Sequence, residues 1–119
     1  MLPRRQDPTP LLPLAASAFQ ILLVLADGDR HGYAITKEVA DTTGGAIRLG
    51  SGTLYRMLKQ MCTDGWIREI ERDDADAMGR RYYRITPWGK RIAQAEAQRL
   101  EALVDLARAR KLLPMRAYA

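Results

Sequence analysis

The amino-acid sequence predicts a mainly α-helical, α+β fold that ends in one long helix. The chain has 119 residues, a length that suits a single hydrophobic core. Apolar residues make up 47% of it, which is enough to build that core. Four segments have helix-like patterns of apolar residues, and two short β-patterned segments lie between the third and the fourth.

The first expected helix covers residues 14–26 and is apolar on nearly every side. A helix of this kind is buried all round. In so short a chain, we expect part of it, with Phe19, Leu22 and Leu23, to pack against a second subunit. The stretch "DGDRHG" then gives two turn signals. A second helix is expected over residues 32–42, ended by the glycines of "TTGG".

The third expected helix follows "RLGSG" and has the clearest helical period in the chain. Its apolar residues recur at i, i+3, i+4, i+7 and i+8: Leu54, Met57, Leu58, Met61 and Cys62. Its other face is polar: Thr53, Arg56, Lys59, Gln60 and Thr63. We expect Ser51 to be the N-cap, because a serine hydroxyl can accept a hydrogen bond from the free N–H groups of a first turn.

The two β-patterned segments are "WIREIER" at 66–72 and "RRYYRIT" at 80–86. They are expected to pair as a hairpin with a seven-residue loop. Tyr82 and Tyr83 are interpreted as packing residues, because nothing in the sequence indicates a single-stranded nucleic acid to stack on them.

The last expected helix begins at Pro87, whose missing N–H has no partner to lose in a first turn. It is expected to run to about residue 113, which makes it about 38 Å long. Its heptad seam steps by four and three residues, with Leu103 beside it: Ala93, Ala97, Leu100, Val104 and Ala107. So long a helix overhangs a small domain, and we therefore expect it to pack on a second copy of the chain.

Three helices followed by two strands predict a winged helix-turn-helix with a two-stranded wing and a long C-terminal dimerisation helix. In that arrangement the third helix can enter the major groove of DNA. The expected organisation is a flexible, proline-containing arm at 1–13, a winged-helix DNA-binding domain at 14–86 and the dimerisation helix at 87–119.

Composition narrows the classes of function. The densest apolar stretch, at 18–26, is too short to span a bilayer, so a cytoplasmic protein without a membrane partner is expected. One cysteine and one histidine cannot build a zinc site within one chain. With no nucleophile pair or paired carboxylates apparent, neither enzyme activity nor a cofactor is expected. The net charge of +5 favours a polyanionic partner only modestly, because residues 1–50 are neutral overall.

Four motifs carry a more specific resemblance: "HGYAI" at 31–35, "SGTLYRML" at 51–58, "DGWI" at 64–67 and "GRRYYRITPWGK" at 79–90. In this order they resemble PadR-type transcriptional regulators of the short branch, from about residue 14 to the end. The resemblance implies a bacterial winged-helix protein that binds double-stranded DNA as a homodimer. Such a protein usually acts as a repressor that is released by a small-molecule effector or a signal. Members commonly have proline where this chain has Ser51.

The resemblance favours DNA contacts from three places. The third helix would supply most of them: Ser51, Gly52, Thr53, Tyr55, Arg56 and Lys59. The start of the second helix would add Tyr33, and the second strand would add Arg80, Arg81 and Arg84. Arg56 could contact a guanine edge or a phosphate, and Lys59 a phosphate. His31 either binds a phosphate or merely caps the turn.

Other interpretations stay open beside this one. Trp66 and Trp88 could line an effector pocket at the dimer interface, or they could simply pack in the core. The glycines of "GSGTLYR" do not make a phosphate loop, because no Lys-Ser/Thr follows them. Asp73, Asp74 and Asp76 make the wing tip acidic, so phosphate should repel it. This tip and the neutral first half leave a winged-helix protein-interaction module, without specific DNA binding, as the alternative function.

Overall fold

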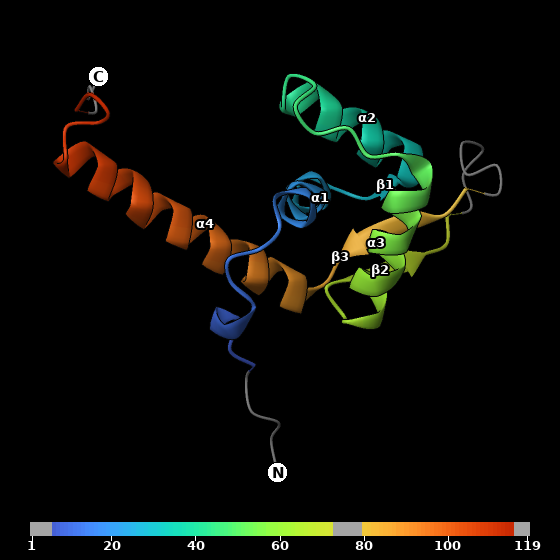
Figure 1. Cartoon of the computed structure of the whole chain (residues 1–119). Helices are drawn as coiled ribbons and strands as arrows, with labels where there is room; N and C mark the ends of the chain where they lie inside the picture. Colours follow the sequence, from blue (N-terminus) through green and yellow to red (C-terminus); the bar gives the residue numbers. More distant parts are fainter. Residues whose placement is uncertain (1–5, 73–79, 116–119) are drawn as a thin grey trace, which may run out of the picture.

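The computed structural model of the chain describes residues 6–72 and 80–115. A short 3-10 turn η1 precedes four helices and three strands: η1 (Thr9–Leu11), α1 (Ala16–Ala26), β1 (Arg30–His31), α2 (Gly32–Thr42), α3 (Ser51–Thr63), β2 (Ile67–Ile70), β3 (Tyr82–Ile85) and α4 (Pro87–Ala109). The first three helices cluster beside the sheet, and α4 extends away from them (Figure 1). This arrangement confirms the predicted winged helix-turn-helix.

The core lies where α1, α2, α3, the sheet and the start of α4 meet. Every one of these elements contributes at least one fully buried aliphatic side chain: Ile21, Leu25, Ile35, Leu54, Leu58, Ile67 and Ile92. Burying each such side chain contributes about 1.5–3 kcal/mol. The period of α3 is confirmed, because Leu54, Leu58 and Met61 are buried while Met57 and Cys62 are half-buried against the same core.

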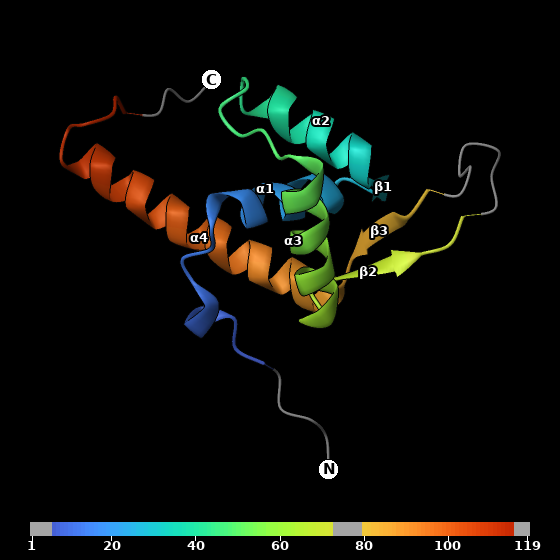
Figure 2. The ribbon, with the colours of Figure 1, turned by 45° about the vertical axis from the view of Figure 1, so that its right-hand side comes forward.

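The sheet has three antiparallel strands in the order β1-β3-β2. The pairing of β2 with β3 aligns Ile67 with Ile85 and confirms the predicted hairpin. Figure 2 shows these two strands running together away from the helices. The sequence did not predict β1, where His31 pairs with Tyr82. Two residues are too few to show a β period. The acidic wing tip at 73–79 lies outside the described residues.

The start of α4 packs directly on the backbone at the start of the wing. Thr86 caps α4, with its Oγ1 accepting from the Gly89 N–H at 3.0 Å. The Thr86 N–H donates to the Trp66 carbonyl at 3.0 Å. A Cβ atom added to Gly89 would lie only 2.0 Å from that carbonyl oxygen. Only glycine therefore lets the first turn of α4 come this close to Trp66.

The N-terminal segment, for which the sequence predicted a flexible arm, lies against α4 over its described part. The Leu14 N–H donates to Glu96 Oε2 at 2.8 Å, and the Gln6 carbonyl accepts from the Arg91 guanidinium. Helix α1 starts at Ala16, two residues after the expected start at Leu14. Glu96 is only 2% exposed. Its hydrogen bond from Arg99, and then the one from Leu14, hold the pKa of its carboxyl below the ordinary value, although burial opposes the shift.

The end of α4 comes at Ala109, four residues before the expected end at about 113. Lys111 adopts a left-handed conformation with φ of 64°. The N–H groups of Lys111 and Leu112 then donate to the carbonyls of Arg108 and Ala107, which is a Schellman ending. No residue pattern indicates this ending in advance, because glycine usually occupies the position that Lys111 holds here.

The residues predicted for dimerisation divide into two groups. Leu22 is fully buried in the chain's own core, so it offers no surface to a partner, and the prediction for this residue is corrected. Leu23, Leu100, Leu103 and Val104 are between 37% and 50% exposed. Ala97 is exposed as well, whereas Phe19, Ala93 and Ala107 are half-buried. The outer half of α4 thus carries an apolar surface that the described part of the chain does not cover.

We expect the substitution Gly89→Ala to destabilise the fold by about 3 kcal/mol or more, because the new methyl group would collide with the Trp66 carbonyl. Urea unfolding followed by circular dichroism measures it. Gly52→Ala is the matched control, since a Cβ there meets no described atom within 4 Å. Equal stability of the two variants would contradict the close contact.

We also expect a pH-dependent contribution from Glu96. Its pKa is lowered on folding from an ordinary value of 4.5, so its ionised form stabilises the fold above that pH. This stability is lost as the pH falls through the folded pKa. The advantage of the wild type over Glu96→Gln in urea unfolding should therefore be largest near neutral pH and shrink in acid. A stability difference between the two proteins that stays constant down to pH 3 would contradict the contribution of ionised Glu96.

Candidate nucleic-acid interface

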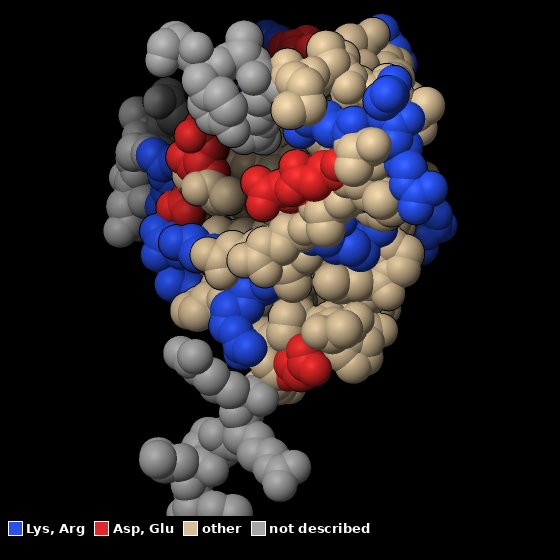
Figure 3. All heavy atoms as spheres, turned by 90° about the vertical axis from the view of Figure 1, so that its left-hand side faces the viewer, with Lys and Arg blue, Asp and Glu red and all other residues tan. Residues whose placement is uncertain are grey.

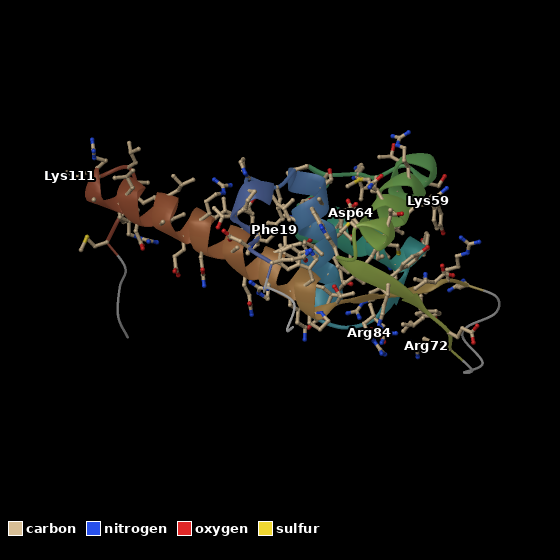
Figure 4. The ribbon with its side chains drawn as sticks, turned by 90° about the horizontal axis from the view of Figure 1, so that it is seen from below. Phe19, Lys59, Asp64, Arg72, Arg84 and Lys111 are labelled. Atoms are coloured by element: carbon tan, nitrogen blue, oxygen red, sulfur yellow. The ribbon has the colours of Figure 1, made fainter. Side chains whose placement is uncertain are left out.

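The outward face of α3 carries the polar residues that the sequence predicted for DNA contact. Its helical period buries Leu54 and Leu58, so Tyr55 and Arg56 between them point away from the core. All six predicted α3 residues are exposed: Ser51, Gly52, Thr53, Tyr55, Arg56 and Lys59. Figure 4 shows Lys59 on the outer side of this helix.

The start of α3 differs from the prediction in one respect. Gly50 is the N-cap, and Ser51 is the first helical residue. The Gly50 carbonyl accepts the first helical hydrogen bond, from the Leu54 N–H at 2.9 Å. The hydroxyl of Ser51 is therefore exposed on the first turn, without the capping role that the sequence predicted.

The start of α2 is held by His31 and touches α3. His31 Nδ1 accepts from the Ala34 N–H at 3.2 Å and so caps the helix. Tyr33 follows and is 70% exposed. A Cβ atom added to the buried Gly32 would lie 2.7 Å from the Tyr55 hydroxyl. Because Gly32 lacks that atom, Tyr55 of α3 can lie across the first turn of α2.

A hollow of about 540 Å³ lies where α2, α3 and the wing meet. Its lining comes from all three: His31, Gly32, Tyr33, Tyr55, Arg80 and Arg81. Four of these were predicted for DNA contact from separate parts of the sequence, and the fold brings them together. Guanidinium and phenol groups donate hydrogen bonds, and phosphate oxygens accept them. The hollow is therefore suited to an anion rather than to a cation.

The wing arginines do not share one environment. Arg81 is exposed, and its Nε lies 3.6 Å from Glu69 Oε1, which makes a weak surface ion pair. Arg84 instead donates twice to Asp29, at 3.0 and 2.7 Å. Hydrogen bonding from Arg84 lowers the pKa of Asp29. Figure 4 shows Arg84 on the other side of the wing strands from Lys59, so the fold does not bring Arg84 to the hollow.

Two features of this region escaped the sequence reasoning. The ion pair between Asp29 and Arg84 joins segments 55 residues apart, and no local pattern signals it. The role of His31 stayed open because its capping bond depends on the geometry of β1. The "HG" step before a helix was its only sequence signal.

The two tryptophans predicted for an effector pocket pack partly buried against the core. The Trp88 ring lies 5.2 Å from the Arg91 guanidinium carbon. Another hollow, of about 270 Å³, lies between α1 and α4, and Leu23, Ala93 and Ala97 help to line it, but neither tryptophan does. An effector role for Trp66 and Trp88 stays a prediction.

Other kinds of site receive no support from the described residues. Cys62 is half-buried, and burial raises the pKa of its thiol, which makes it a poorer nucleophile. Within residues 6–72 and 80–115, no three His, Cys, Asp or Glu side chains are grouped to hold a metal ion. In the same ranges no helix is long and apolar enough to cross a membrane.

The charges on the end of the molecule toward which α4 extends are mixed. Figure 3 views this end, with acidic and basic side chains interleaved with uncharged surface. A polyanion is attracted by a surface on which positive charge predominates. This end is therefore a poorer candidate for DNA than the face formed by α3 and the hollow.

A family comparison agrees with this geometry. The model of the transcriptional regulator PadR-like family matches residues 21–95, which run from the second half of α1 through β3 to the start of α4. The chain belongs to the PadR-like family of transcriptional regulators. The matched region contains Tyr33, the whole of α3 and the wing arginines.

Two solved structures share the fold, and a curated protein is similar in sequence. A solved PadR family transcription regulator from Clostridium difficile is 25% identical, with a TM-score of 0.68 over 80% of this chain and 97% of that one. Bacillus subtilis PadR, solved in complex with operator DNA, is 24% identical, with a TM-score of 0.59 over 74% of this chain and 48% of that one. "Protein X" of Lysinibacillus sphaericus is 33% identical over 70 residues, 59% of this chain and 64% of that protein. The match thus spans less than two thirds of that curated relative.

Proposed function

We propose that the chain is a homodimeric transcriptional repressor that reads a two-fold symmetric DNA operator. One observation carries this proposal: exposed hydrogen-bond donors from α3, the start of α2 and the two residues before β3 lie on one face. Membership of the family supports regulation of transcription. The solved complex of Bacillus subtilis PadR with operator DNA supports DNA as the partner.

The proposed contacts follow from the placement of each side chain. With 13 residues, α3 is about 20 Å long, and its outer face fits a major groove about 12 Å wide. Arg56 donates to a guanine edge or a phosphate from the exposed middle of the helix, and Lys59 donates to a phosphate one turn later. Tyr33 and Arg80 hold the backbone beside the groove. Arg84, which is engaged by Asp29, stabilises the wing instead.

The proposed dimer forms through the apolar surface of α1 and α4. Leu103 and Val104 are exposed on a helix that extends beyond the domain, and Leu23 borders the apolar hollow between α1 and α4. Covering such a surface removes apolar area from water. A second copy places a second α3 about one DNA turn away, so that two half-sites are read together.

The proposed release mechanism uses the angle between the two copies of α4. Because α4 starts on the wing backbone at Gly89, a change in that angle moves each α3 with it. A small-molecule effector or signal that binds better to one angle shifts the population toward it and changes the spacing of the α3 pair.

A winged-helix module that binds proteins rather than DNA is the second candidate. The observation that favours it is the pairing of two wing cations, Arg81 with Glu69 and Arg84 with Asp29. Ion pairs of this kind reduce the positive field at the wing. The salt dependence of DNA binding separates the two candidates, because only phosphate neutralisation releases counterions.

We expect Arg56→Ala to weaken binding to a duplex from the promoter of the protein's own operon by about 10-fold and to relax its sequence preference. Lys59→Ala should weaken binding to all duplexes and lower the salt slope by about 1. Fluorescence anisotropy at several salt concentrations measures both. Arg110→Ala, at the far end of α4, is the control and should bind as the wild type does. If both α3 variants bind normally, the assignment of α3 is wrong.

We expect the wild type to sediment as a dimer at micromolar concentration and Leu103→Asp to shift it toward the monomer. Leu103 is 50% exposed in the single chain, so the substitution leaves the chain's own core intact. Circular dichroism checks that the variant is folded. A wild type that is monomeric at this concentration would contradict the proposed dimer, whatever its affinity for DNA.

A further inference from the structure

The imidazole of His31 lies between two hydrogen-bond donors. Its Nδ1 accepts from the Ala34 N–H at 3.2 Å, which caps α2. Its Nε2 lies 3.2 Å from Arg80 Nη1. A guanidinium group only donates hydrogen bonds, and so does a backbone N–H.

The proton count does not allow both contacts to be hydrogen bonds. A neutral imidazole carries one N–H and one acceptor nitrogen. Because Nδ1 accepts from Ala34, the ring proton lies on Nε2, where it faces the Arg80 guanidinium. Burial first, and then the charge of Arg80, lower the pKa of His31, so the neutral ring is favoured. Two N–H groups therefore converge, and an acceptor that binds there would satisfy both.

The ring is held in this orientation. Tyr82 meets it edge to face, with ring centroids 5.4 Å apart at 88°, and Tyr33 is stacked at 6.4 Å. Turning the ring over would break its capping bond to Ala34. The Nε2–H group, held in this orientation, and the exposed Arg80 both border the hollow between α2, α3 and the wing.

The chemistry of the hollow selects the acceptor. Its described lining contains no Asp or Glu, and it adds Arg81 and the hydroxyls of Tyr33 and Tyr55 to the two converging donors. An anionic oxygen fits such a set of donors. The N–H groups of the α2 start are not the main donors, since His31 already occupies one of them.

We propose that His31 and Arg80 together bind one phosphate of the DNA backbone, which accepts hydrogen bonds from Nε2–H and from the guanidinium. This assignment rests on the proposed DNA-binding function and deepens it. His31 has both of the roles left open by the sequence: one ring nitrogen caps α2, and the other binds phosphate. Arg80 is the charged partner, whereas His31 fixes where the phosphate sits relative to α2.

The tautomer of His31 is the first test. His31 is the only histidine in the chain, so protein labelled with ¹⁵N-histidine gives one pair of ring nitrogen signals. We expect Nε2 to carry the proton in the free protein, and its proton signal to move downfield when a 20-bp duplex is added. A proton on Nδ1 in the free protein would overturn the proposal, because Nε2 would then simply accept from Arg80.

A double-mutant cycle is the second test. His31→Asn keeps an acceptor for the α2 cap but has no Nε2–H, so its unfolding in urea should match the wild type. We expect it to weaken duplex binding about 3- to 10-fold with an unchanged salt slope. Arg80→Gln should weaken binding and lower the slope by about 1. Because both residues hold one phosphate, the double variant should lose less than the product of the single effects.

The outcomes separate this proposal from the one on which it rests. If the wild type shows no salt-dependent binding to the duplex, DNA binding and the phosphate site fail together. If the wild type binds but His31→Asn binds equally well, or the two effects simply multiply, only the shared phosphate site is wrong.

Discussion

The close approach of α4 to the Trp66 carbonyl is the constraint on which the arrangement of the molecule depends. A side chain at Gly89 would occupy the space of that oxygen. Because residue 89 has no side chain, Thr86 can both hydrogen-bond to Trp66 and cap α4. The end of α3, the start of the wing and the start of α4 are thus in contact around Trp66.

The pairing of some cations within the chain explains how a protein of modest net charge can present a positive face to a polyanion. Several cations are engaged by neighbours, as Arg84 is by Asp29 and Arg30 is by Asp27 and Glu38. Arg56 and Lys59 are exposed on α3 instead. The sign of the local field is set by which cations are paired, and the total of +5 says little about it.

The sequence predicted those features that a local pattern encodes. Helix α2 occupies residues 32–42 as predicted, and the apolar period of α3 correctly gave its buried face. Two of the differences, at β1 and before α1, involve contacts with distant segments, whereas the early end of α4 comes from a left-handed conformation at Lys111 that only a glycine would have signalled. Strand β1 is defined by its pairing with β3, and the Leu14 N–H just before α1 donates to Glu96, 82 residues away. The two contacts of His31 likewise need β1, α2 and β3 to be assembled.

In the candidate site, too, some features follow from local spacing and others depend on how the helices pack. Exposure of the α3 residues followed from their spacing, because a buried stripe fixes which face is outward. The hollow did not follow, since Gly32 and Tyr55 meet only through the packing of α2 on α3. The burial of Leu22 in the chain's own core could not be predicted either, because the pattern of an all-apolar helix does not indicate which of its faces the same chain covers.

The most direct test of the central claim is a map of backbone amide shifts in ¹⁵N-labelled protein as a promoter duplex is added. We expect the largest changes at residues 31–33, 51–59 and 80–81, with little change over residues 100–109. Changes concentrated in the outer half of α4, or none in α3 at saturating DNA, would contradict the account.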